Sequence, residues 1–462
     1  MNPNILFLCI DSFRADRCFG KKKSSYTPNI DSLINSGIYF QQAIGSTDYT
    51  IPAMESIFTS RFPINASNDE DVYRKQNPER SNIIHELKNL GYSIYATIPK
   101  SFSNLEFMDL FENKFEFEHD GYSEKSQIFS GLGEKIIHNL EKNAFKAPWF
   151  YYIHLIDLHK GSKPFEEFDK KEFGNDNYDR TISSIDVWIG RIMKKINLEN
   201  TIVIITSDHG EYIRSILHDE QNIDLEFQSM GEIGRKIGNK IPLKLYPLTS
   251  NLFLKIRKSL TILKLIKTRK KTITNHEKRS IFFARTSSDR YLYDDIIHIP
   301  LIFAGFGINH KIISQQVRSV DIFPTILELI GKKPINNIKD GKSLIPLFNN
   351  QTFNEDYAYL ESATFPITKE FQKSVKPVMG LRTSKYKYFR KIKESKQVFL
   401  YDLENDPLEE KNIALKYPKI VKNMENDLKN IRDRSIQVKT GNKMNQEEIK
   451  KVENELKKLG YI

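Results

Sequence analysis

The sequence predicts an α/β fold with a central, largely parallel mixed sheet flanked by helices. Short, solidly apolar runs rich in β-branched and aromatic residues are typical of strands buried on both faces of such a sheet. Five runs fit this description: NILFLCI (4–10), YSIYATI (92–98), WFYYIHLI (149–156), TIVIIT (201–206) and IPLIFAG (299–305). Strands that alternate with helical segments indicate a layered α/β architecture.

Helical patterns fill the gaps between these runs. Helices are predicted at residues 52–59, 82–90, 132–143 and 178–195. In the last of them, isoleucines recur at helical spacing and define one apolar face: Ile182, Ile185, Ile189 and Ile192.

The pattern of the sequence changes from about Tyr357. Four short strand-like segments follow one another without long helices between them, which predicts a small antiparallel sheet. Residues 417–459 are charged with a nearly helical apolar period, so they are predicted to form surface helices. The expected division is an α/β domain at 1–350 and a C-terminal subdomain at 351–462, with the antiparallel sheet and the terminal helices.

The net charge of +11 is local rather than general. From Lys255 to Arg279 there are ten basic residues and one acidic residue, a net charge of +9, so the rest of the chain is almost neutral. This distribution gives no reason to expect a nucleic-acid partner. The chain has only two cysteines, which excludes a disulfide framework. It shows no signal peptide and no apolar run of the ~20 residues that a membrane span needs, so a cytoplasmic location is expected.

Polar residues follow three of the predicted strands. Asp11 follows the first, Asp157 and His159 follow the third, and Asp208 and His209 follow the fourth. Ligands of open α/β sheets bind beyond the carboxyl ends of the strands. Carboxylates and imidazoles that meet there predict a site for a divalent cation.

A hydroxyl stands at the start of the first predicted helix. Thr50 precedes Pro52, which suits the first turn of a helix. A helix N-terminus attracts an anion such as phosphate or sulfate, and a hydroxyl held there beside a metal can attack an ester at phosphorus or sulfur.

Each of these residues also has a plainer interpretation. A strand-end aspartate can cap the next helix, and Thr50 can be the N-cap of its own helix. His154 lies inside an apolar run and is predicted to be an ordinary core histidine with satisfied hydrogen bonds.

The order of the motifs resembles the sulfatase family, within the alkaline phosphatase superfamily. The matching stretches include PNILFLCIDSFRADR, the Thr-x-Pro helix start, IHLIDLHKG, TSDHGE, LYDDIIHIPLIFAGFGI, VRSVDIFPTILELIGKKP and LYDLENDPLEEKNIA. They cover most of the chain apart from residues 212–285 and about the last forty.

The resemblance implies an alkaline phosphatase-like fold and a role for each matching residue. Asp11, Asp208 and His209 match metal ligands, and Thr50 occupies the nucleophile position. His159 and Lys100 match residues that contact the transferred anion. One divalent cation is implied: calcium or magnesium as in sulfatases, or manganese, magnesium or zinc as in phosphotransferring relatives.

Several positions depart from the sulfatase pattern. Thr50 cannot be converted to formylglycine, which requires Cys or Ser in a Cys-x-Pro-Ser-Arg context. Ser12 stands where many sulfatases have a second metal carboxylate, and Phe102 stands where a histidine follows the lysine. Arg290 is the nearest cation before the Leu-Tyr-Asp-Asp motif. A threonine nucleophile is typical of phosphoglycerol and phosphoethanolamine transferases, which favours phosphate over sulfate esters.

The predicted function is therefore hydrolysis or transfer of a phosphate or sulfate ester, of a glycan or a lipid-linked substrate, through a covalent intermediate on Thr50. The alternative is a catalytically impaired protein of the same fold that binds an anionic glycan or a membrane surface. An insertion at residues 213–290 contains a basic amphipathic helix within the segment from Lys255 to Arg279. Its lysines suit a membrane surface or an anionic glycan, or else it is a lid or an oligomer contact with solvated lysines.

Overall fold

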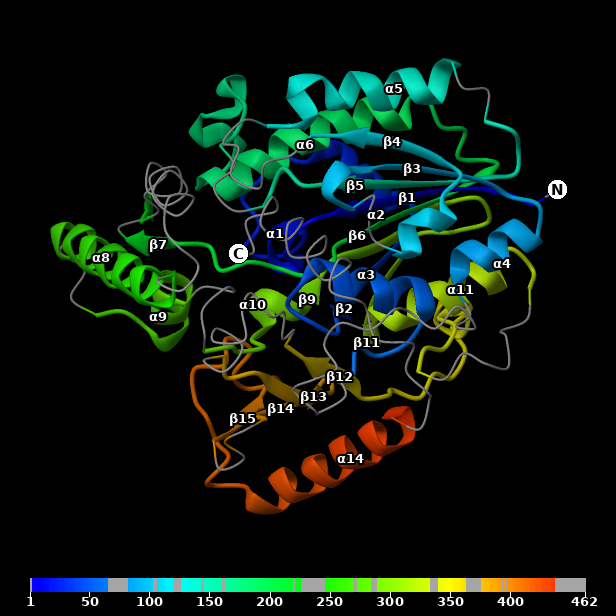
Figure 1. Ribbon diagram of the computed structural model, residues 1–462. Helices are drawn as coiled ribbons and strands as arrows, with labels where there is room; N and C mark the ends of the chain where they lie inside the picture. The colour runs from blue at the N-terminus through cyan, green and yellow to red at the C-terminus, as the bar shows by residue number, and fades with distance from the viewer. Residues whose placement is uncertain are drawn as a thin grey trace.

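The main sheet of the molecule is mixed, largely parallel and flanked by helices, as the sequence predicts (Figure 1). The computed structural model describes residues 2–64, 82–102, 106–118, 126–142, 145–159, 163–218, 221–225, 246–268, 272–283, 289–332, 340–362, 375–392, 394 and 397–436. The sheet order is β11 (Lys311–Arg318), β2 (Ile38–Ile44), β10 (Leu301–Gly305), β6 (Thr201–Thr206), β1 (Asn4–Ile10), β5 (Trp149–Leu155), β3 (Ser93–Pro99) and β4 (Asn113–Phe117). A short strand, β9 (His298–Ile299), pairs with β2.

Five neighbouring strands, from β6 to β4, run parallel, whereas β10 is antiparallel to both of its neighbours. Alternate residues of β1 point to opposite faces, so Phe7 and Cys9 join one apolar core while Leu6 and Leu8 join the other. Helices cover the first core: α3 (Thr50–Thr59), α4 (Ile83–Asn89), α11 (Ile322–Leu329) and α12 (Ile345–Phe348). The second is covered by α1 (Ala15–Cys18), α2 (Pro28–Ser36), α5 (Gly133–Lys142) and α6 (Asn177–Met193).

A second, four-stranded sheet is antiparallel throughout, in the order β12 (Ala358–Glu361), β13 (Val378–Arg382), β14 (Tyr386–Lys391) and β15 (Val398–Asp402). The helix α14 (Pro418–Ile436) packs on it through Met424 and Leu428. Both features match the predicted C-terminal sheet and helix; the rest of the predicted terminal helices lies outside the described residues.

The predicted insertion forms a lobe at one side of the main sheet (Figure 1). It contains the hairpin β7 (Ser215–His218) and β8 (Gln221–Asp224), then α8 (Tyr246–Lys267) and α9 (Asn275–Phe282), and leads to α10 (Asp294–Ile297). Among the helices that the structure describes, none combines the length and the apolarity needed to cross a bilayer.

Candidate metal centre and active site

Strand register brings three side chains that could bind a metal to one face of the sheet. β1 lies between β5 and β6, and Cys9 is in register with His154 on one side and with Thr206 on the other. Residues in register share a face, and so do residues two positions apart along a strand. Asp11 and Asp208 lie two positions beyond Cys9 and Thr206, so both carboxylates meet His154.

Asp11, His154 and Asp208 form a buried cluster that fits a cation. One ligand atom from each lies within 4.8 Å of the others. Oδ1 of Asp208 accepts hydrogen bonds from the backbone N–H of Ser12 (3.1 Å) and of His209 (2.8 Å), which fixes the carboxylate. Its Oδ2 is buried and has no hydrogen-bond partner among the described residues. A buried carboxylate oxygen without a donor is costly unless a cation binds it.

Both histidines of the centre are oriented through Nδ1. Nδ1 of His209 lies 2.9 Å from the carbonyl oxygen of Gly210, which leaves Nε2 facing Asp208 Oδ2 at 3.3 Å. Nδ1 of His154 lies 2.7 Å from the Tyr152 hydroxyl, and its Nε2 lies 3.7 Å from Asp11 Oδ2. This is the arrangement expected of metal-binding histidines, whose other nitrogen is usually held by a hydrogen bond.

The interpretation of His154 as a satisfied core histidine is therefore wrong. Its Nε2 is buried and lacks a hydrogen-bond partner within the part of the chain that the structure describes. Phe102, which replaces the histidine expected there, packs edge-on against the His154 ring with centroids 4.9 Å apart.

Thr50 is not an N-cap, so that alternative is also wrong. The N-cap of α3 is Tyr49, and Thr50 is the first helical residue. The Thr50 side chain is fully buried, with Oγ1 lying 3.4 Å from Asp11 Oδ2 and 3.3 Å from His209 Nε2. The structure thus brings the predicted nucleophile, one carboxylate and one imidazole together.

The charges around Asp11 favour its ionised form. Burial alone would raise the pKa of this carboxyl, but the imidazoles of His159, His154 and His209 outweigh burial and hold the pKa well below its usual range. His159 is itself buried behind the end of β5. Burial, with the nearby carboxylate of Asp208, raises the pKa of the Cys9 thiol beneath the site, so this cysteine is neutral.

Arg290 contacts Tyr49, the residue that precedes Thr50. Its guanidinium stacks over the ring of Tyr49 at 5.0 Å, and the side chain is only 4% exposed. Nε and Nη1 make no hydrogen bond to any described residue. Two buried donors with positive charge are suited to an anion.

The structure places Lys100 and Asp157 in other surroundings. Lys100 is exposed just after β3, with its ammonium 2.6 Å from Glu118. Asp157 accepts hydrogen bonds from the Ser126 hydroxyl (2.6 Å) and the backbone N–H of Ile128 (3.1 Å), so it holds the start of the helical segment after residue 126. Lys100 remains a prediction as an anion contact.

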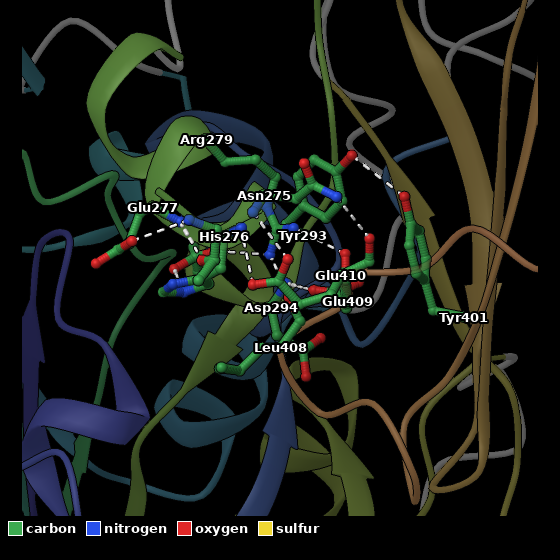
Figure 2. Close-up of polar contacts among 12 residues, drawn as sticks. Asn275, His276, Glu277, Arg279, Tyr293, Asp294, Tyr401, Leu408, Glu409 and Glu410 are labelled. Atoms are coloured by element: carbon green, nitrogen blue, oxygen red, sulfur yellow. Dashed lines mark hydrogen bonds and ion pairs between the residues drawn. The ribbon is translucent and has the colours of Figure 1, made fainter. Parts of the chain in front are cut away.

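A buried ionic network connects the centre with the insertion. Arg14, three residues after Asp11, pairs with Asp295 at 2.7 Å, and Asp295 also contacts His276 of α9 at 3.1 Å. Figure 2 shows the same helix bound to the 408–410 loop: Arg279 donates to the carbonyl oxygens of Leu408 (2.6 Å) and Glu409 (2.8 Å). The sequence pattern gave no signal for this network.

The fold and the centre define an α/β protein of the alkaline phosphatase type, and comparison with known proteins identifies the family. The chain belongs to the sulfatase family: the family model described as Sulfatase matches residues 3–332. A model described as N-sulphoglucosamine sulphohydrolase, C-terminal, matches residues 285–434.

Individual relatives are more distant. Arylsulfatase K of Canis lupus familiaris is 34% identical over 146 residues, which are 30% of this chain and 26% of that protein. The chain thus matches about a quarter of the length of this curated relative. Solved structures similar across the fold include a 2-O GAG sulfatase, with 15% identity, 96% and 95% of the two chains covered and a TM-score of 0.63. Another is the phosphonate monoester hydrolase of Agrobacterium radiobacter, with 16% identity, 94% and 96% covered and a TM-score of 0.61.

Proposed function

We propose that the chain hydrolyses a sulfate ester with Thr50 as the nucleophile. The observation that carries the proposal is the buried Thr50 hydroxyl, which lies between Asp11 Oδ2 and His209 Nε2 at 3.4 and 3.3 Å. A hydroxyl flanked by two proton acceptors at a metal-binding centre has the arrangement of an activated nucleophile.

Four donors are available to one divalent cation. Asp11, Asp208 and His209 are the ligands that the sequence predicts, and His154 adds a donor that only strand register reveals. Calcium, magnesium and manganese are the candidates, because carboxylate oxygens suit all three. A cation bound here would lower the pKa of the Thr50 hydroxyl and polarise the ester.

Thr50 Oγ1 then attacks sulfur while its proton moves to Oδ2 of Asp11, because Nε2 of His209 would be occupied by the cation. The bond between sulfur and the ester oxygen breaks, the ester oxygen takes up this proton and leaves as the alcohol, and the sulfuryl group is held on Thr50. The Arg290 guanidinium supplies positive charge for the non-bridging oxygens, together with His159. Water attacks sulfur in the second step and releases sulfate and the free threonine.

A sulfated glycan is the substrate class that the family favours, since one similar structure is a 2-O GAG sulfatase. A phosphate ester is the second candidate, and the observation in its favour is Thr50 itself, because this residue cannot become formylglycine. Transfer to an acceptor alcohol differs from hydrolysis only in the second step. The metal-stripped protein, reloaded with each cation and assayed on aryl sulfate, aryl phosphate and sulfated disaccharides, separates these candidates.

Thr50→Val tests the nucleophile, because valine keeps the branched shape and removes the hydroxyl. We expect kcat to fall at least about 10³-fold, with little change in stability. Thr59→Val, at the other end of α3, is the matched control: its hydroxyl bonds the Glu55 carbonyl oxygen at 2.7 Å and lies on the same helix. Equal turnover in wild type and Thr50→Val would exclude the nucleophile. Anion binding with no turnover on any ester would instead support a catalytically impaired protein.

A further inference from the structure

The helix α8 turns an apolar stripe away from the protein. Its most exposed apolar side chains are between 47% and 66% exposed and recur at helical spacing: Leu252, Ile256, Leu263 and Ile266. On the opposite side of the helix Thr261 is buried and Leu265 packs against the cluster around Ile281. The apolar side is therefore not the side by which α8 is attached.

The helix is fixed to the rest of the molecule. Leu265 packs with Ile216 and Leu225 of the neighbouring hairpin segment and with α9, and α9 is anchored by the contacts of Figure 2. Figure 1 shows α8 at the outer edge of the molecule, beside α9 and β7 and away from both large sheets. The stripe is thus presented outward on a firmly attached element.

Lysines lie on both sides of the stripe. Lys255 and Lys267 are exposed and follow Leu252 and Leu263 by three and four residues, so they flank the stripe on the helix surface. The segment from 246 to 267 contains no acidic residue. Lysines that flank an apolar stripe can reach lipid phosphates while the stripe enters the acyl boundary.

We propose that α8 lies in the plane of an anionic lipid surface, with Leu252, Ile256, Leu263 and Ile266 buried in it and the flanking lysines on lipid headgroups. A second copy of the chain fits less well, since a two-fold contact between stripes would bring like charges together. A soluble polyanion would satisfy the lysines and leave the stripe in water. The proposal does not depend on the chemistry at Thr50.

Flotation with vesicles tests whether α8 binds an anionic lipid surface. The full chain is expected to bind vesicles of equal parts phosphatidylcholine and phosphatidylglycerol at low salt, and to bind phosphatidylcholine alone weakly. The double variant Leu263→Glu, Ile266→Glu should lose at least about a hundredfold in affinity, since each change removes an apolar contact. Lys255→Gln and Lys267→Gln should each lose roughly fivefold.

Leu415→Glu is the matched control, because Leu415 is 98% exposed on a different surface. It should bind vesicles as wild type does, and circular dichroism should show all variants folded. The proposal is overturned if wild type does not bind, or if the stripe variant binds as tightly as wild type. A wild-type dimer in sedimentation velocity that the stripe variant converts to a monomer, without vesicle binding, would overturn it in favour of self-association.

Discussion

Replacing Arg290 with methionine should make the protein more stable and less active. The guanidinium is buried, and Nε and Nη1 have no hydrogen-bond partner among the described residues. A buried donor without a partner destabilises by about 1–3 kcal/mol, so two of them destabilise by about 2–6 kcal/mol. Methionine loses the contact with Tyr49, which stabilises by about 1–2 kcal/mol. The net gain is on the order of 2 kcal/mol.

The thermal shift from this gain is small but measurable. Unfolding entropy scales with chain length, so a chain of 462 residues changes its Tm by about 1 °C per kcal/mol. Arg290→Met should therefore melt about 2 °C above wild type. Its kcat should fall by about 10²–10³, the loss typical of removing a donor to a developing anion. Vanadate should raise the Tm of wild type and leave that of the variant unchanged, because ligand stabilisation requires binding.

Arg14 is the comparison residue for Arg290, because it is buried to the same extent but is paired with carboxylates. It is as buried as Arg290, 4% exposed, but its guanidinium pairs with Asp16 and Asp295 at 2.7 Å each. Arg14→Met removes the closest cation from the buried carboxylate of Asp295 and should destabilise by about 3 kcal/mol. Scanning fluorimetry with a turnover assay checks both variants. If Arg290→Met melts below wild type and is still stabilised by vanadate, Arg290 is structural and the reasoning fails.

Two further predictions follow from buried groups. Burial, with Asp294, raises the pKa of Glu409 to about 7 despite Lys387 at 2.6 Å, so between its ordinary 4.5 and 7 the folded state holds a proton that the unfolded chain releases. Stability from this group is lost as pH rises through that window. Between pH 4.5 and 7, the free energy of unfolding of wild type should fall by about 3 kcal/mol relative to that of Glu409→Gln, as measured by urea titration. The same pH dependence in both proteins would contradict this prediction. His154→Asn should weaken manganese binding by at least about tenfold in calorimetry. Unchanged affinity would mean that His154 is a core histidine and not a metal ligand.

The sequence predicted strands well where both faces are buried. All five apolar runs form strands of the main sheet, because a strand between two helical layers needs apolar residues on both sides. It did not predict β2, β4 and β11, which carry glutamines or charged residues. In β2, Gln41 and Gln42 are half-buried, and Gln42 reaches the Ser314 carbonyl oxygen at 2.9 Å. In β4, at the sheet edge, lysine and glutamate interrupt the apolar pattern.

The candidate site likewise contains some residues that the sequence pattern predicts and others that only the tertiary structure identifies. Asp11 and Asp208 could be predicted because a strand end is visible in the sequence. His154 could not, because its role depends on its register with Cys9, a residue 145 positions away in the chain. The sequence also could not decide whether Thr50 caps its helix. The backbone of the structure is needed to identify Tyr49 as the N-cap, which excludes capping by Thr50.

The network around Asp295 connects the insertion to the candidate metal centre through side-chain contacts. Arg14 leaves the strand end that carries Asp11, and through Asp295 it contacts α9, against whose cluster α8 packs. The links are the buried ion pair of Arg14 with Asp295, the part-buried contact of His276 with Asp295, and the apolar contacts of Leu265. A buried ion pair resists displacement because separating it leaves an unpaired charge. If α8 rests on a lipid surface, the centre is held at a fixed offset from it, which suits an anionic ester presented from that surface. The basic insertion would then restrict where the proposed ester hydrolase meets its substrate.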